Sequence, residues 1–402
     1  MNTVPGGPGA SPRARLPGTI HALGVASLCM DASSELVHAI LPLYLTLSLG
    51  IGVAAIGVIE GVAEATAAVV KVFSGALSDR IERRKPVVVG GYALSALAKP
   101  LFPLAGGVGL VVAARWLDRI GKGIRGAPRD ALIADVVPPA QRGAAYGLRQ
   151  ALDSVGACIG PLLALGLMVL WTQDLRLALW VAVIPGLLAV AVLVVFVREP
   201  PRMVPPLRRP SLSRVEMLRL PRRLWLVAGL GALLTLARFS DAFLVLRGQS
   251  VGLPLAWVPV VMVLMNAVYA AASAPAGALA DRRGTRALLG WGTALLVASH
   301  TALAAADGPV LLFAGAILWG LHLALTQGLL AKLVAGAAPQ HLRGTAFGVF
   351  HLITGVALLV ASALAGWLWE KAGPAAPFAA GTLFALVAGA GLALVARRQA
   401  RA

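Results

Sequence analysis

Six of the charged residues in the otherwise apolar stretch 108–135 are spaced as one set. At 100° per residue they would cover an arc of roughly 120° on one face of a helix. A charge at the centre of a lipid-facing helix costs at least about 2.5–3.5 kcal/mol, so this face must line water, a solute or another helix. The six residues are Arg115, Asp118, Arg119, Lys122, Arg125 and Arg129.

Two interpretations of these six charged residues remain open. The residues from Lys122 to Arg129 lie nearer the predicted cytoplasmic surface, where they are suited to setting orientation or to a salt-bridge gate. Arg115, Asp118 and Arg119 lie deeper. Because Asp118 neutralises only one of the two guanidinium groups, the excess of positive charge favours an anionic solute. A structural Arg–Asp pair is the alternative.

A second group of residues is suited to moving protons. Asp31, Glu35 and His38 follow one another at spacings of four and three in the apolar range 19–47, so they share one face of a helix. Two carboxylates this close repel when both are ionised, and sharing a proton is the cheaper state. His38 can relay that proton near neutral pH. We predict a proton-coupling site here, with a structural hydrogen-bond cluster as the alternative.

Five further charges lie in other apolar ranges. Glu64 shares a helical face with Glu60 and Lys71, and Arg238 and Asp241 lie in the range 224–249. We expect Glu64 to join the proton-coupling site and Arg238 and Asp241 to join Arg115, Asp118 and Arg119 in binding the solute.

The sequence lacks the motifs of familiar enzymes and cofactor sites. It contains no nucleotide-binding P-loop, no His-Glu-x-x-His pair and no Gly-x-Ser-x-Gly elbow. Cys29 and Cys158 lie apart in apolar segments, so neither a disulfide framework nor a zinc site is indicated. We therefore expect no cofactor, no metal and no enzymatic activity. A membrane-embedded transferase is a remote alternative, but it would need a metal-binding array of carboxylates.

The composition indicates a membrane protein in which these charges are exceptions. Of 402 residues 58% are hydrophobic and 13% charged, and the mean hydropathy is +0.83, against roughly 45–50% apolar residues in soluble proteins. A membrane-spanning helix needs about 20 apolar residues. Twelve such segments can be counted, at residues 19–47, 54–77, 86–105, 108–135, 144–170, 177–197, 224–249, 256–279, 286–306, 309–334, 344–368 and 376–396.

The segments form two bundles of six separated by a polar linker. Residues 1–18 are predicted to be a disordered cytoplasmic tail, 19–197 the first bundle, 198–223 an Arg- and Pro-rich cytoplasmic linker, 224–396 the second bundle and 397–402 a short tail. The segments predicted to face the cytoplasm hold 28 of the Lys and Arg residues, and the opposite side holds three. This asymmetry places both termini in the cytoplasm. Because the Lys and Arg residues gather in alternate loops on one side of the membrane, they argue against a nucleic-acid partner despite a net charge of +18.

The two halves repeat each other. The hexapeptide from Gly75 to Arg80 recurs from Gly277 to Arg282 at an offset of 202 residues, and Arg142-Gly143 recurs as Arg343-Gly344. Parallel repeats with a binding site near the midplane between them are a transporter architecture.

At these residues the chain resembles the major facilitator superfamily, whose signature after the second helix reads G-x-L-x-D-R-x-G-R-R. Glu82 replaces the signature Gly. The resemblance implies twelve helices and a cytoplasmic gate that latches the two halves together. The gate residues it implies are Gly75, Asp79, Arg80, Arg84, Gly277, Asp281, Arg282 and Arg286.

Two further motifs refine the expected function. The segment from Arg115 to Asp130 is similar to a poorly characterised bacterial branch of the superfamily, which carries no assigned substrate. The motif Gly156-x-x-x-Gly160-Pro161 is similar to one common in its proton antiporters. We therefore expect a monomeric multi-pass protein of the inner membrane that exports a small organic solute, favoured to be anionic, in exchange for protons. Proton-coupled uptake is the alternative.

Overall fold

The computed structural model describes residues 16–80, 83–138, 141–199, 220–338 and 343–400. This part of the chain is helical and contains no strand. The helices of the first half are α1 (Gly18–Leu43) with the π-helical η1 (Tyr44–Ser48), α2 (Val53–Arg80), α3 (Lys85–Ala98), α4 (Leu101–Leu104), α5 (Val108–Val136), α6 (Arg142–Leu170), α7 (Leu175–Val181) and α8 (Val183–Phe196). Those of the second half are α10 (Arg222–Leu236), α11 (Ala242–Ser250), η3 (Leu255–Trp257), α12 (Val260–Arg283), α13 (Thr285–Ala304), α14 (Pro309–Ala337), α15 (Arg343–Ala372) and α16 (Ala376–Ala400).

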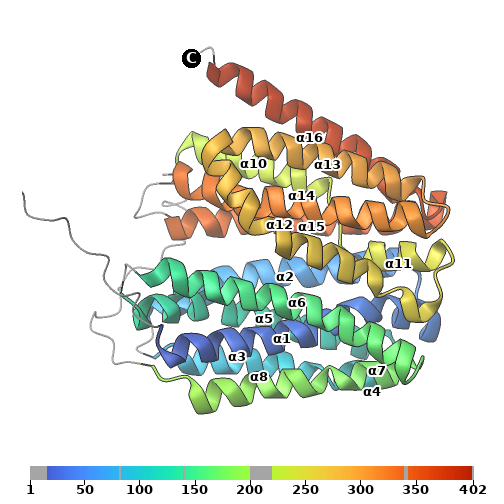
Figure 1. The fold of residues 1–402 in the computed structure, drawn as a ribbon, viewed down its shortest axis with the longest axis horizontal. Helices are drawn as coiled ribbons and strands as arrows, with labels where there is room; N and C mark the ends of the chain where they lie inside the picture. The colour runs from blue at the N-terminus through green and yellow to red at the C-terminus, as the bar shows by residue number, and fades with distance from the viewer. Residues whose placement is uncertain (1–15, 81–82, 139–140, 200–219, 339–342, 401–402) are drawn as a thin grey trace, which may run out of the picture.

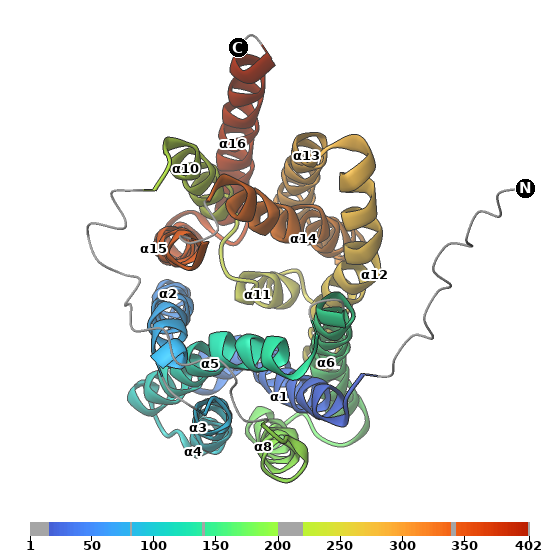
Figure 2. The ribbon, with the colours of Figure 1, turned by 90° about the vertical axis from the view of Figure 1, so that its left-hand side faces the viewer.

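The helices form two bundles that lie side by side (Figure 1). The first bundle holds α1 to α8 and the second holds α10 to α16, and α2 packs against α15 while α6 packs against α12. Figure 2 shows α11 near the centre, between the two bundles. The start of α1 and the end of α16 lie at the same end of the molecule.

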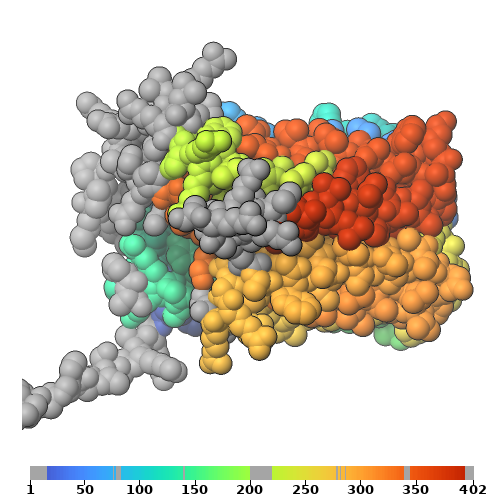
Figure 3. Space-filling view, turned by 90° about the horizontal axis from the view of Figure 1, so that it is seen from above, coloured from blue at the N-terminus to red at the C-terminus, as the bar shows by residue number. Residues whose placement is uncertain are grey.

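The outer surfaces are apolar. Figure 3 shows the outer face of the second bundle, with α10 and α16 on its surface. Trp225 on α10 is 45% exposed and Leu383 on α16 is 64% exposed, and Ile184 on α8 is 67% exposed on the first bundle. In the described residues, nine helices are long and apolar enough to cross a membrane. Such surfaces are stable in contact with lipid.

Three predicted ranges, 19–47, 108–135 and 224–249, do not meet that criterion of length and composition. The first carries Asp31, Glu35 and His38, and the second carries the six charges from Arg115 to Arg129. The third was predicted as one helix, and the structure corrects this, because α10 and α11 are separated by a break at residues 237–241.

The break is stabilised by partners from other helices. A ring nitrogen of His300 lies 2.7 Å from the carbonyl oxygen of Ala237, and the backbone N–H of Ser240 donates to Ser362 Oγ at 3.1 Å. Backbone groups released by a break within a membrane must be satisfied inside the protein. His300 and Ser362 meet that requirement, and the break places Arg238 and Asp241 between two half-helices.

Two of the three basic residues on the predicted extracellular side have a structural role. The Arg247 guanidinium is buried and donates to the carbonyl oxygens of Leu303, Ala304 and Ala306 at 2.9, 3.2 and 2.7 Å. Arg176 Nη2 lies 3.4 Å from the carbonyl oxygen of Ala105. Basic side chains commonly satisfy the free carbonyl groups at helix C-termini. Arg247 therefore anchors the end of α13 to α11.

Replacing Arg247 by Ala should lower the apparent melting temperature of the purified protein in detergent by several degrees. Three carbonyl groups lose a charged donor, and each hydrogen bond to a charged group contributes about 1.5–3 kcal/mol. Lys371→Ala is the matched control, since Lys371 is an exposed basic residue predicted on the same side. An equal loss in both variants would contradict the anchoring role.

Candidate functional site

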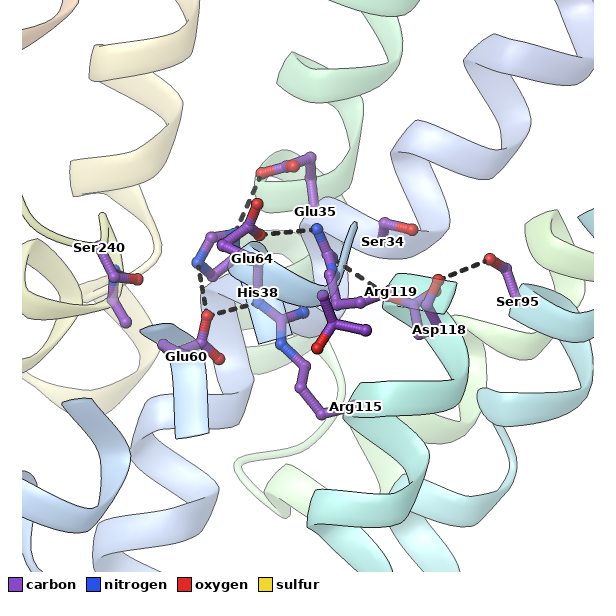
Figure 4. A network of polar contacts seen from close by, with 12 residues as sticks. Ser34, Glu35, His38, Glu60, Glu64, Ser95, Arg115, Asp118, Arg119 and Ser240 are labelled. Atoms are coloured by element: carbon purple, nitrogen blue, oxygen red, sulfur yellow. Dashed lines mark hydrogen bonds and ion pairs between the residues drawn. The ribbon is translucent and has the colours of Figure 1, made fainter. Parts of the chain in front are cut away.

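The deeper part of the charged face of α5 is buried against the rest of the first bundle. Arg115, Asp118 and Arg119 are 0%, 1% and 2% exposed, and α5 packs against α2 and α3. This agrees with the expectation that the face cannot contact lipid. Figure 4 shows the polar network that these side chains form with residues of α1 and α2.

Each arginine of this group meets a carboxylate of α2. Arg115 Nη2 donates to Glu60 Oε2 at 2.5 Å, and both side chains are almost completely buried. Arg119 donates from Nη1 to Glu64 Oε1 at 2.8 Å, and its Nη2 lies 3.1 Å from Asp118 Oδ2. These pairs join α5 to α2 at two successive turns.

Lys99, which follows α3, completes the network. Its ammonium group donates to Asp118 Oδ1 at 2.9 Å and to Ser34 Oγ at 3.0 Å, and its side chain has no exposed surface. Three carboxylates thus face three cations. The prediction that Asp118 leaves one of the two arginines uncompensated is wrong, because Glu60 and Glu64 neutralise them from another helix.

The proton-coupling residues predicted on α1 are brought together only in part. His38 Nδ1 lies 3.8 Å from Glu35 Oε2, and His38 Nε2 lies 3.8 Å from Glu60 Oε2. Asp31 lines the cavity described below without an ion pair or hydrogen bond to the described residues. The second carboxylate beside His38 is thus Glu60 of α2, which shares a predicted helical face with Glu64, and not Asp31 of α1.

A polar cavity lies between the two bundles beside this network. Its inner part has a volume of about 350 Å³, and it adjoins a part of about 520 Å³ that shares many lining residues. Cavities of about 300–1,000 Å³ suit small molecules. Both halves contribute to its walls. The polar lining residues include Asp31, Glu35, Glu64, Lys122, Asp153, Arg238 and Gln327.

Three cations of the cavity wall have no partner among the described residues. The side chains of Lys71 on α2, Lys122 on α5 and Arg238 in the α10–α11 break make no ion pair within 4 Å and no hydrogen bond in that part of the chain. Asp241 does not pair with Arg238; its Oδ1 accepts a hydrogen bond from Trp319 Nε1 at 3.0 Å. The unpaired positive charge therefore lies at the cavity wall and not in the buried α5 pairs.

The cavity is closed at one end by contact between α2 and α15. The backbone N–H of Ala54 donates to Glu370 Oε1 at 2.9 Å. A Cβ atom at Gly57 would lie only 2.2 Å from the carbonyl oxygen of Ser362, so the two backbones touch there. Glycine alone permits this close approach.

At the other end the cavity continues outward. An outer part of about 820 Å³ is lined by residues near the ends of the helices that adjoin the loops predicted to be cytoplasmic, among them Gly75, Gln150, Ser273 and Phe347. In Figure 1 this is the end where α1 begins and α16 ends. The structure is therefore open at that end and closed at the other.

The predicted gate residues lie around this open end. The side chains of Asp79, Arg80, Asp281 and Arg286 are outside the described residues. Gly75 and Gly277 line parts of the cavity, Arg282 is exposed, and Arg84 Nε lies 3.3 Å from Asp135 Oδ2 of the same bundle. A latch between the halves stays a prediction.

The fold and the cavity define a helical membrane protein built from two repeats around a central polar site. The sequence profile of the Major Facilitator Superfamily matches residues 23–266 and 242–402. An uncharacterized MFS-type transporter of Methanocaldococcus jannaschii is 33% identical over 385 residues, covering 92% of this chain and 93% of that protein. The chain belongs to the Major Facilitator Superfamily, a family of transporters and not of enzymes.

Two further similarities place the chain more broadly. The multidrug resistance protein MdtH of Proteus mirabilis is 34% identical over 110 residues, which cover 27% of this chain and 26% of that protein. The crystal structure of the nucleoside transporter NupG superposes with a TM-score of 0.79 at 12% identity, covering 94% of this chain and 99% of that chain. The second similarity shows the shared fold.

Glu60→Gln should destabilise the protein strongly, because it leaves the Arg115 guanidinium buried without a carboxylate. Removing one partner of a buried ion pair costs about 3–5 kcal/mol. Glu64→Gln is the matched control, since Glu64 is 26% exposed and Arg119 keeps Asp118. Apparent melting temperatures of the purified variants test the prediction. If Glu60→Gln is no less stable than Glu64→Gln, the Arg115 pair does not carry this stability.

Proposed function

We propose that this protein is a proton-coupled secondary transporter that exports a small organic solute by alternating access. The observation that carries the proposal is the cavity between the two halves, which is lined by unpaired charges, closed at one end and open at the other. Relative rocking of two repeats about such a site is how this class of fold moves a solute. The protein is proposed to work as a monomer.

The direction of the opening follows from the proposed topology. With twelve membrane-spanning segments and both termini in the cytoplasm, the open end faces the cytoplasm and the structure is inward-facing. The excess of Lys and Arg in the loops at that end supports this orientation. The homologues are bacterial and archaeal, which fits a location in the cytoplasmic (inner) membrane.

Proton coupling is proposed to run from Glu35 through His38 to Glu60. Glu35 lines the cavity with 22% of its side chain exposed, whereas Glu60 is 1% exposed. His38 lies 3.8 Å from each carboxylate, and neither His38 Nε2 nor Glu60 Oε1 has a hydrogen-bond partner among the described residues. A small movement of the imidazole would let it exchange a proton with either acid. Asp31 and Glu64 are proposed to be further proton acceptors in the cavity wall.

This relay connects to the closed end of the cavity. Glu60 lies in α2 between Gly57 and Gly61, and both glycines touch α15 of the other half. Protonation of Glu60 would weaken its pair with Arg115 and so change the force that holds α2 against α5. Loading a proton is thereby coupled to the helix that closes the site.

Two similarities support export over uptake. The motif Gly156-x-x-x-Gly160-Pro161 packs α6 tightly on α1, since a Cβ atom at Gly160 would lie 2.8 Å from Glu35 Cβ. Its resemblance to the antiporter motif and the partial similarity to a multidrug resistance protein favour proton antiport. Proton-driven uptake uses the same cavity and coupling residues and is the second candidate.

An anionic group on the solute is supported by the unpaired cations of the wall. Lys122 and Arg238 line both inner parts of the cavity, with Lys71 close to its mouth. Arg119 also lines the innermost part, but Arg115 and Asp118 lie behind the wall and position the others. Of the predicted solute-binding residues, Arg238 therefore has the strongest claim to direct contact.

Glu35→Gln should abolish solute movement driven by a pH gradient while sparing solute exchange, because Gln cannot accept a proton but preserves the size of the side chain. Fluxes in proteoliposomes with and without an imposed gradient measure both. Asp307→Asn removes an exposed carboxylate outside the cavity and is the control. Unaltered gradient-driven accumulation in Glu35→Gln would exclude Glu35 from coupling.

Glu370→Ala should increase opening at the end that is closed in this structure, because it removes the hydrogen bond to the Ala54 N–H. The net contribution of such a bond, about 0.5–1.5 kcal/mol, corresponds to a two- to tenfold change in population. A Gln327→Cys reporter in a background lacking Cys29 and Cys158 can be labelled with an impermeant maleimide from the outer face. Lys371→Ala is the control. Equal labelling rates in the two variants would contradict the role of the Glu370–Ala54 hydrogen bond in closing this end.

A further inference from the structure

The unpaired charges of the cavity are separated by sign. The carboxylates Asp31 and Glu35 lie on α1. Asp153 on the neighbouring α6 lines the same space but pairs with Arg149 Nη1 at 3.0 Å. The cations Lys71 and Lys122 lie on α2 and α5, and Arg238 lies in the α10–α11 break. The two sets line the same space, yet no described carboxylate oxygen lies within 4 Å of a nitrogen of these three cations.

The packing of the helices keeps the two sets apart. A Cβ atom at Gly156 would lie 2.4 Å from the carbonyl oxygen of Leu28, so α6 and α1 form one wall without a gap. A Cβ atom at Gly123 would lie 2.6 Å from Val70 Cβ, so α5 and α2 form another. Figure 2 shows α1 with α6 on one side of the molecule and α2 with α15 on the other.

The charges on both walls must be compensated when the cavity closes around a solute. Charges that lose their water need partners, since an uncompensated buried charge costs several kcal/mol. A simple anion would pair with the cations of α2, α5 and the helix break but leave the carboxylates of α1 facing a like charge. A simple cation would leave Lys122 and Arg238 unpaired.

We propose that the transported solute is zwitterionic, with a carboxylate or phosphate-like group bound by Lys122 and Arg238 and an amino group bound by Asp31 and Glu35. This inference rests on the proposed transport function and names its substrate class. An ammonium group and a proton cannot occupy Glu35 together, so binding of the solute releases the proton. Exchange of the two then follows from the site itself.

The cavity offers a suitable space between the two walls. Its inner part, about 350 Å³, admits a solute of amino-acid or small-peptide size. Uncharged polar groups line the region between the walls. Tyr269 donates to Gln327 Oε1 at 3.2 Å, and Asn266 donates to the carbonyl oxygen of Ala157 at 3.0 Å.

The test uses sets of four probes that share one skeleton and differ only in charge. For phenylalanine, 4-aminobutyrate and 5-aminovalerate the probes are the free amino acid, its N-acetyl derivative, its methyl ester and the N-acetyl methyl ester. Binding to purified protein is measured by thermal stabilisation and by calorimetry at one pH. On at least one skeleton the zwitterion should bind about tenfold or more tightly than either singly charged probe, which is the effect of one charged hydrogen bond.

Variants then assign each charge to its wall. Lys122→Gln should weaken binding of the zwitterion and leave the methyl ester unaffected, and Asp31→Asn should weaken binding of the zwitterion and leave the N-acetyl derivative unaffected. Lys371→Gln is the control for loss of a positive charge, and only variants that keep the wild-type melting temperature without ligand are compared. The same loss for all probes in each variant would contradict the assignment.

Two other outcomes separate this inference from the transport proposal. If N-acetyl derivatives or methyl esters bind as tightly as the free amino acids, or if only solutes with a single charge are bound and transported, the zwitterion inference is overturned while transport stands. If proteoliposomes move no solute of a broad metabolite and toxic-compound panel, with or without a pH gradient, the proposed function itself fails.

Discussion

A guanidinium group without exposed surface, that of Arg115, imposes the main constraint on the first bundle. The effective cost of removing one ion from water is several kcal/mol, and an ion pair recovers it only with good geometry. Glu60 supplies that geometry from α2, and the same requirement joins Arg119 to Glu64 and Lys99 to Asp118. The relative positions of α2, α5 and the end of α3 follow from satisfying these charges together. One side of this group of paired charges, with Glu64 and Arg119, forms part of the cavity wall.

The second bundle meets the low-dielectric environment in a different way. Its described cavity-facing residues include few charges, of which Arg238 and Asp241 come from the break between α10 and α11, while uncharged groups such as Tyr269 and Gln327 come from α12 and α14. Phe239 packs at ring-centroid distances of 5.3–5.8 Å against the rings of His300, Trp319 and Phe378. This aromatic group holds the break in place and presents Arg238 to the cavity. One half thus supplies a rigid charged layer, and the other supplies irregular backbone and a single free guanidinium.

Paired and unpaired charges therefore have separate roles in the transport proposal. The buried pairs Arg119–Glu64 and Lys99–Asp118 keep helices in register while the two halves move, and the Arg115–Glu60 pair is the one that protonation is proposed to weaken. The unpaired groups on α1, α2, α5 and the break are free to exchange water, protons and solute. His38 lies between the two classes, since it contacts one cavity carboxylate and one buried carboxylate at the same distance. This position makes it the natural point at which protonation acts on the structure.

The sequence by itself determined the class of protein, the approximate ends of most helices and the internal repeat. It also determined that the charged face of α5 could not contact lipid. Each of these depends on local hydropathy, helical period or comparison of one half with the other. Only the tertiary structure decided which charges pair, because the partners are 19 residues apart for Lys99 and Asp118 and 55 apart for Arg115 and Glu60. Helical period gives the face of a residue but not the rotation and depth of the neighbouring helix. The break at 237–241 was hidden for a similar reason: its sequence contains neither Pro nor Gly, and the groups that stabilise it, His300 and Ser362, come from other helices.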